Sequence, residues 1–264
     1  MNLGLQGKQA VVTGSTAGIG LAIASTLAEE GARVIINGRT EARVAAALDS
    51  IRQRTRSADV RGIASDLGNS EGVARFIEQA PKADILVNNL GIFEPKPFLE
   101  IPDSDWIRFF AVNVLSGVRL TRHFLPGMLR KNWGRVIFIA SESAQQIPAE
   151  MIHYGMTKTA QVAIARGLAE SVAGTGVTVN SVLPGPTASE GVTEFVQEMG
   201  RRQGVSAAEI EKQFFATVRP SSLLKRFATP EEVAAVVAFV ASAQGAIING
   251  AAVRAEGGIL RSIL

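Results

Sequence analysis

The chain contains no cysteine among its 264 residues. This absence excludes disulfide bonds, thiolate metal ligands and cysteine nucleophiles, and it fits a reducing compartment. His123 and His153 are the only histidines, so the sequence offers little for a zinc-type site and we expect no metal.

Long apolar runs and a strong charge imbalance are also missing. No uninterrupted apolar run approaches the roughly 18 residues that a membrane helix needs, and the first residues do not combine a basic segment with an apolar one. The 27 basic and 24 acidic residues leave a net charge of +3 and are scattered along the chain. We therefore expect a cytoplasmic protein with neither a nucleic acid nor a membrane as its partner.

Short runs rich in Val and Ile recur along the chain, with segments of helical length between them. They lie at 9–13, 33–37, 60–64, 83–88, 135–140 and 177–183. Runs of this kind predict strands that are buried on both faces of a mainly parallel sheet with helices on both sides. No repeat or linker interrupts the pattern, so we expect a single α/β domain over residues 1–264.

Helical signals fill several of the intervals between these runs. They lie at 22–28, 42–51 and 160–172, and Pro230 with two following glutamates is typical of a helix start. The longest break in the alternation runs from residue 184 to 220. Long connections in compact domains often form lids or binding loops, so we expect a substrate lid at about 187–220.

A glycine-rich turn directly follows the first predicted strand. Gly14, Gly18 and Gly20 lie where the chain passes into the first helix. Glycines at these positions permit a tight turn and let the backbone approach a pyrophosphate at the helix N-terminus. A simple chain reversal would show the same pattern, so the neighbouring motifs must decide between a dinucleotide site and a purely structural turn.

The end of the second predicted strand favours a phosphorylated dinucleotide. An acidic side chain there would accept a hydrogen bond from the ribose 2′-hydroxyl, but the chain has Gly38 followed by Arg39. An arginine suits a 2′-phosphate, because it forms charge-assisted, forked hydrogen bonds. The other interpretation makes Arg39 a solvated residue before a helix that Thr40 caps. We predict NADP(H), with NAD(H) as the alternative.

A tyrosine and a lysine four residues apart provide a candidate catalytic pair. Tyr154 is the only tyrosine, and Lys158 lies on the same face if the segment is helical. A nearby ammonium favours the phenolate and so lowers the tyrosine pKa toward the range useful for acid–base chemistry. Ser141 follows the strand run at 135–140, at the end where open α/β sheets bind ligands. An exposed Tyr–Lys pair and a capping serine are the structural alternatives.

Taken in order, these motifs resemble the short-chain dehydrogenase/reductase (SDR) family over almost the whole chain. Asn89 and Gly91 lie in a segment similar to the family's NNAG motif, with Leu90 replacing its alanine. Further matches are Asp66-Leu67 after the third strand run, Asn113 in Val112-Asn113-Val114, the segment 180–185, and Glu256-Gly257-Gly258. Ala255 stands where an aspartate is usual in the family.

The resemblance implies a Rossmann-type doubly wound fold and a role for each member of a catalytic tetrad. Tyr154 would protonate the carbonyl oxygen, Ser141 would orient it, and Lys158 would hold the nicotinamide ribose and lower the tyrosine pKa. Asn113 would deform its helix so that a water links Lys158 to solvent. The cofactor contacts it implies are Gly14, Ser15, Thr16, Gly18, Ile19, Gly20, Arg39, Asp66, Leu67, Asn89, Gly91, Tyr154, Lys158, Pro184, Gly185 and Thr187.

The sequence therefore predicts an NADP(H)-dependent oxidoreductase that interconverts a small-molecule carbonyl and a secondary alcohol, and the resemblance implies a homotetramer or homodimer. One alternative is a 3-oxoacyl-[acyl-carrier-protein] reductase, although Asn132 and Thr175 stand where such enzymes tend to carry basic residues. Another is a catalytically silent dinucleotide-binding sensor. Two orientations are open for the His153 side chain, which faces either the pocket or solvent.

Overall fold

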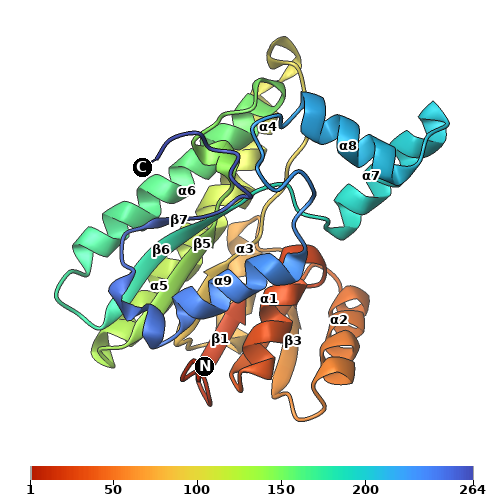
Figure 1. Ribbon diagram of the computed structural model, residues 1–264. Helices are drawn as coiled ribbons and strands as arrows, with labels where there is room; N and C mark the ends of the chain where they lie inside the picture. The colour runs from red at the N-terminus through yellow and green to blue at the C-terminus, as the bar shows by residue number, and fades with distance from the viewer. Residues whose placement is uncertain (1, 264) are drawn as a thin grey trace.

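The apolar runs form the strands of one parallel sheet in the computed structural model, which describes residues 2–263 (Figure 1). The strands are β1 (Gln9–Val12), β2 (Arg33–Gly38), β3 (Val60–Ala64), β4 (Ile85–Asn88), β5 (Gly134–Ile139), β6 (Val177–Pro184) and β7 (Ala252–Ala255). Their order in the described sheet is β3-β2-β1-β4-β5-β6-β7, and every neighbouring pair is parallel. The predicted doubly wound α/β fold is confirmed.

Helices cover both faces of the sheet. They are α1 (Gly18–Glu29), α2 (Glu41–Arg54), α3 (Ser70–Gln79), α4 (Asp103–Phe110), α5 (Ser116–Arg130), α6 (Ile152–Ser171), α7 (Glu190–Gln203), α8 (Ala207–Thr217) and α9 (Pro230–Ala241). Buried side chains of α1, α2 and α9 pack on one face, and those of α3, α5 and α6 on the other. No helix within residues 2–263 is long and apolar enough to cross a membrane.

Two strands differ from the predicted apolar runs. The fourth predicted run starts at residue 83, whereas β4 begins at Ile85, directly after Asp84, whose carboxylate accepts hydrogen bonds from the Gln9 amide at 2.9 Å and from Lys131 Nζ at 2.5 Å. Strand β7 is absent from the predicted runs because it is short, half-buried and contains Arg254. It lies at the sheet edge, where only one side of the strand needs a partner.

Helices α7 and α8 occupy most of the predicted break between residues 184 and 220. Figure 1 shows them projecting together from one end of the molecule. Phe214 and Phe215 pack against Phe227, with ring centroids 5.2 Å apart in each case, and so attach α8 to the chain that leads into α9. The role of this pair as a lid stays a prediction.

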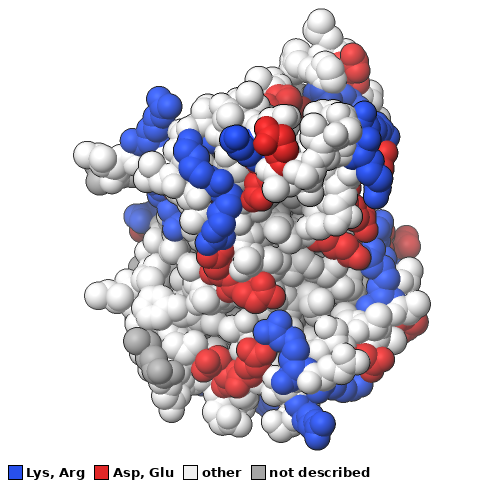
Figure 2. All heavy atoms as spheres, turned by 45° about the vertical axis from the view of Figure 1, so that its right-hand side comes forward, with Lys and Arg blue, Asp and Glu red and all other residues white. Residues whose placement is uncertain are grey.

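The sheet order reverses at β1, which pairs with β2 on one side and β4 on the other. At such a point the connections leave toward opposite faces, and a crevice forms beyond the carboxyl ends of the strands. Figure 2 shows acidic and basic side chains interspersed on one face of the molecule, with no single-sign patch. The reversal of the strand order at β1 therefore locates a candidate site beyond the carboxyl ends of the strands.

The start of α9 offers a test of local stability. Thr229 Oγ1 accepts a hydrogen bond from the Glu232 amide at 3.2 Å, and Glu232 Oε2 accepts one from the Thr229 amide at 2.8 Å. We expect Thr229→Ala to lower the free energy of unfolding by about 1 kcal/mol, because the helix loses this reciprocal cap. Urea unfolding followed by circular dichroism measures the loss. Thr229→Ser is the control and should stay near the parent, whereas equal stability of all three proteins would contradict the prediction.

Candidate active site

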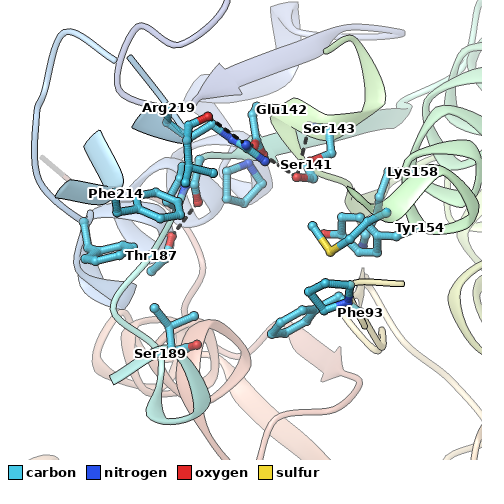
Figure 3. A pocket seen from close by; sticks show the side chains of 18 of the residues that line it. Phe93, Ser141, Glu142, Ser143, Tyr154, Lys158, Thr187, Ser189, Phe214 and Arg219 are labelled. Carbon is cyan, nitrogen blue, oxygen red and sulfur yellow. Dashed lines mark hydrogen bonds and ion pairs between the residues drawn. The ribbon is translucent and has the colours of Figure 1, made fainter. Parts of the chain in front are cut away.

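A cavity of about 560 Å³ opens beyond the carboxyl ends of β4, β5 and β6. Side chains from these strand ends, from α6 and from the α7–α8 segment line it (Figure 3). Much of the wall that the α7–α8 segment provides is apolar, including Val196, Met199 and Phe214. Such a pocket accommodates a small organic molecule and fixes it by a few polar groups.

Three predicted catalytic residues, Ser141, Tyr154 and Lys158, converge on this cavity. Ser141 follows β5, and its Oγ accepts a hydrogen bond from the Ser143 amide at 3.1 Å, so the serine also caps the short 3₁₀ helix 142–144. Tyr154 and Lys158 lie one turn apart on α6, with Lys158 Nζ 5.5 Å from the centre of the tyrosine ring. Figure 3 shows the two side chains facing the same space.

Asn113 supports the site from behind and does not line the cavity. It lies in a π-helical segment, Ala111–Leu115, between α4 and α5. Its Oδ1 accepts from the Ile92 amide at 2.8 Å, and its Nδ2 donates to Ile92 O at 3.0 Å and to Thr157 Oγ1 at 2.9 Å. The predicted helix deformation is thus present, and the amide connects the loop after β4 to α6. The main-chain oxygen of Asn113 accepts a hydrogen bond from Gln161 Nε2 at 2.7 Å.

Burial shifts both pKa values of the pair on α6. It raises the pKa of the Tyr154 phenol, and the negative charge of Glu142 raises it further. It lowers the pKa of Lys158 to about 8, while the Glu142 charge acts in the opposite direction. Lys158 donates to Ile139 O at 2.9 Å. The lowering of the Tyr154 pKa by Lys158 stays a prediction.

Glu142 and Arg219 are site residues that the sequence analysis missed. Both are buried and line the cavity, and Arg219 Nε lies 3.2 Å from Glu142 Oε1. The position of Glu142 next to Ser141, just beyond a strand end, was a signal for it. Arg219 carried no signal, because 77 positions separate the two residues and only the fold brings them together.

The glycine turn adopts a backbone conformation that only glycine accommodates easily. Gly14 and Gly18 have φ values of 58° and 55°, in the left-handed region that favours glycine. A Cβ on Gly20 would lie 2.4 Å from Asn89 Nδ2 and 2.5 Å from Gly14 O, so no larger residue fits there. Glycine thus lets this turn pack closely against Asn89 at the start of α1, and its contact with a phosphate stays a prediction.

Some predicted cofactor contacts use their side chains inside the protein. The hydroxyl of Ser15 donates to Val12 O at 2.7 Å and accepts from the Asn37 amide at 2.9 Å, so it joins β1 to β2. The Leu67 side chain is buried in the core. Asp66 accepts from the Gly68 amide at 3.0 Å and shapes the turn after β3. Any contact that Leu67 makes to a ligand must come from its backbone.

Thr16 and Arg39 lie at the carboxyl end of β2, the strand that pairs with β1. Arg39 is exposed. A Cβ on Gly38 would lie 2.4 Å from Thr16 Cγ2, so an acidic side chain at this position would displace Thr16. The contact with Thr16 thus explains why β2 ends in a glycine. Arg39 is then the charged residue nearest to this strand end along the chain.

The remaining predicted contacts lie around the cavity mouth. They are Ile19, Asn89, Gly91, Pro184, Gly185 and Thr187. Asn89 Nδ2 donates to Thr13 O and Gly14 O at 2.9 and 3.0 Å, which fixes the loop after β4 against the glycine turn. Thr187 Oγ1 donates to Gly185 O at 2.9 Å. These residues line the same cavity as Lys158.

His153 takes neither of the two positions considered from the sequence. It is fully buried and does not line the cavity. Its ring lies 4.1 Å from that of Phe109 and 6.0 Å from that of Trp106, between centroids. Burial lowers its pKa, because this aromatic surrounding disfavours the charged imidazolium.

Comparison with known proteins gives consistent matches. The model of the short chain dehydrogenase family matches residues 8–200. YvaG, an uncharacterized oxidoreductase of Bacillus subtilis (strain 168), is 51% identical over 263 residues, with 100% of both chains covered. D-beta-hydroxybutyrate dehydrogenase of Cupriavidus necator is 34% identical over 260 residues, covering 96% of this chain and 98% of that protein.

A solved structure extends the likeness to three dimensions. L-sorbose reductase from Gluconobacter frateurii, complexed with NADPH and L-sorbose, superposes with a TM-score of 0.94 at 31% identity, and 100% of both chains is covered. The single parallel sheet with helices on both sides matches the fold of this structure. The chain therefore belongs to the short-chain dehydrogenase/reductase family and is an oxidoreductase that acts on CH–OH groups.

Proposed function

We propose that the protein is an NADP(H)-dependent reductase of a small or medium-sized ketone, with Ser141, Tyr154 and Lys158 as its catalytic residues. The convergence of these three side chains on one cavity, next to the glycine turn, carries the proposal. Asn113 acts behind them as a positioning residue through Ile92 and Thr157. The reverse oxidation of the alcohol uses the same groups.

The phenol of Tyr154 donates a proton to the carbonyl oxygen during reduction. Its raised pKa keeps it protonated at neutral pH, which suits an acid. The Ser141 hydroxyl donates a hydrogen bond to the same oxygen as negative charge develops on it. Lys158 lies between Ile139 O and the cavity, from where its ammonium holds a ribose hydroxyl.

The glycine turn and the surface around the cavity mouth would hold the dinucleotide. The amides at the start of α1 bind its pyrophosphate, and the backbone at Gly91 and Gly185 borders the nicotinamide end. When bound, the nicotinamide supplies the hydride for reduction or accepts it in oxidation. The α7–α8 segment closes over the substrate as a lid, because it supplies one wall of the cavity.

Preference for the phosphorylated cofactor follows from the rim beyond β2. Arg39 supplies a positive charge there, and the contact between Gly38 and Thr16 excludes an acidic side chain. The NADPH in the sorbose reductase complex supports the same choice. The relatives' names differ in substrate, so they support a carbonyl–alcohol reaction without selecting one molecule.

Tyr154→Phe separates catalysis from cofactor binding. We expect kcat/KM for ketone reduction to fall about 10²- to 10⁴-fold, because the variant lacks the proton donor. The Kd for NADPH, measured by fluorescence titration, should rise less than about tenfold, because the variant loses only one hydroxyl among the predicted cofactor contacts. A protein that binds NADPH but shows no Tyr154-dependent oxidation of it across a carbonyl library would instead be a dinucleotide sensor.

Arg39→Asp tests the cofactor preference. We expect the ratio of kcat/KM with NADPH to that with NADH to fall by about tenfold or more, since a charge-assisted contact to the 2′-phosphate becomes a repulsion. Arg56→Asp is the matched control, because Arg56 is also exposed but lies beyond the other end of α2. An unchanged ratio in Arg39→Asp would remove Arg39 from the cofactor site.

The lowered pKa of Lys158 predicts a pH-dependent cofactor affinity. Below its pKa of about 8 the side chain is an ammonium, and above it the charge is lost. We expect the Kd for NADPH to stay constant below pH 8 and to rise above it, as the ribose loses a charge-assisted hydrogen bond. Fluorescence titrations across this range measure the change. Lys158→Met should show a weak and flat profile, and an equally steep rise in that variant would assign the effect to another group.

A further inference from the structure

The cavity wall beside Ser141 carries a buried ion pair that the roles above do not use. Glu142 is 4% exposed and Arg219 is 9% exposed. Taking two charges out of water is costly unless hydrogen bonds satisfy both partners. Figure 3 shows Arg219 and Glu142 beside Ser141, on the cavity wall with the catalytic groups. A charged pair in this position needs a reason.

The hydrogen bonds around Glu142 account for both of its oxygens. Oε1 accepts from Arg219 Nε at 3.2 Å, and Oε2 accepts from the Ser141 hydroxyl at 2.5 Å. Arg219 is itself fixed, because its Nη1 donates to Val218 O at 3.1 Å and to Glu150 Oε1 at 3.4 Å. The Ser141 oxygen is held by the Ser143 amide. The carboxylate is thus oriented from both sides.

This arrangement conflicts with the proposed role of Ser141. A serine hydroxyl has one proton, and here it is donated to Glu142. When Ser141 donates to a carbonyl oxygen instead, Glu142 Oε2 loses a charge-assisted hydrogen bond in a buried place. A ligand that carries its own donor next to the carbonyl replaces that bond.

We propose that Glu142 recognises a hydroxyl group on the carbon next to the reacting carbonyl, which makes α-hydroxy ketones the substrates of reduction and vicinal diols those of oxidation. The two oxygens of an α-hydroxy ketone are as close to each other as Ser141 Oγ and Glu142 Oε2 are. The ketone oxygen thus accepts from Ser141 while the hydroxyl donates to Glu142. Arg219 is the positioning residue. This inference rests on the proposed function.

The charge of Glu142 also selects against a competing class. The carboxylate of an α-keto acid would lie in the place of the α-hydroxyl, next to another buried carboxylate, and like charges repel there. The apolar wall formed by Val196, Met199 and Phe214 suits the carbon chain of a neutral substrate. The site therefore favours a neutral hydroxy ketone.

Three ketones of similar size test the hydroxyl recognition. Hydroxyacetone carries a donor beside the carbonyl, methoxyacetone carries the same electron-withdrawing oxygen without a donor, and butanone carries neither. We expect kcat/KM with NADPH to be at least about tenfold higher for hydroxyacetone than for methoxyacetone. In Glu142→Gln this ratio should fall by about tenfold, because the amide is a weaker acceptor than the carboxylate. Butanone reduction should change less.

Matched variants separate recognition from folding. Glu150→Gln changes the other carboxylate beside Arg219; because the amide oxygen can still accept a hydrogen bond from Arg219, the ratio should fall less than in Glu142→Gln. Arg219→Gln should lower it and Arg219→Lys should restore part of it, since a cation again orients Glu142. If Glu142→Gln does not fold, the double variant Glu142→Leu/Arg219→Met replaces the pair by apolar side chains and should lose the ratio as well. A ratio unchanged in a folded Glu142 variant overturns the proposal.

A binding measurement makes the result independent of turnover. In the Tyr154→Phe protein with NADPH, ligand-observed NMR should detect hydroxyacetone binding that is at least about tenfold tighter than that of methoxyacetone. Adding Glu142→Gln should abolish the difference. If no ketone is reduced in a Tyr154-dependent manner, the proposed function alone is wrong. If hydroxyacetone and methoxyacetone bind equally well to the protein with Glu142 intact, the recognition by Glu142 is wrong.

Discussion

Parallel pairing of strands buried on both faces is the constraint on which the rest of this structure depends. Every strand in the described sheet runs the same way, so all carboxyl ends meet at one edge. The glycine turn, Arg39, Asn89, Ser141 and Gly185 each follow a different strand, and the sheet alone brings them to one rim. Residues far apart in sequence thereby become neighbours at this edge of the sheet. The site is thus a product of topology first and of side-chain contacts second.

Much of this arrangement could be predicted from the sequence, because it depends on local patterns. The Val- and Ile-rich runs locate six strands to within two residues at each end. Tyr154 and Lys158 share a face because helical spacing requires it. Strand β7 was missed, because an edge strand with half-buried residues lacks a continuous apolar run. The π-helical segment at Asn113 has no local signature, and only the family resemblance indicated a deformation there.

Predictions that depended on environment were less successful. Burial and the charge of Glu142 raise the pKa of Tyr154, and a Tyr–Lys spacing reveals neither. The pair of Glu142 and Arg219 required the path of the chain through α7 and α8 to be known. Burial likewise directs the Ser15 hydroxyl and the Leu67 side chain into the protein although their motifs match. The oligomeric state stays a prediction.

The π-helical segment at Ala111–Leu115 also determines which faces α4 and α5 present to the protein. It adds one residue to a helix that continues as α4 before it and α5 after it. One extra residue turns the later part by about 100° relative to the earlier part. The two halves therefore present different stripes of side chains: α4 packs Phe109 against the ring of His153, while α5 packs Leu120 and Phe124 into the core under the sheet. A single inserted residue thus lets one continuous helix pack against two surfaces, which a regular helix would face with the wrong side chains.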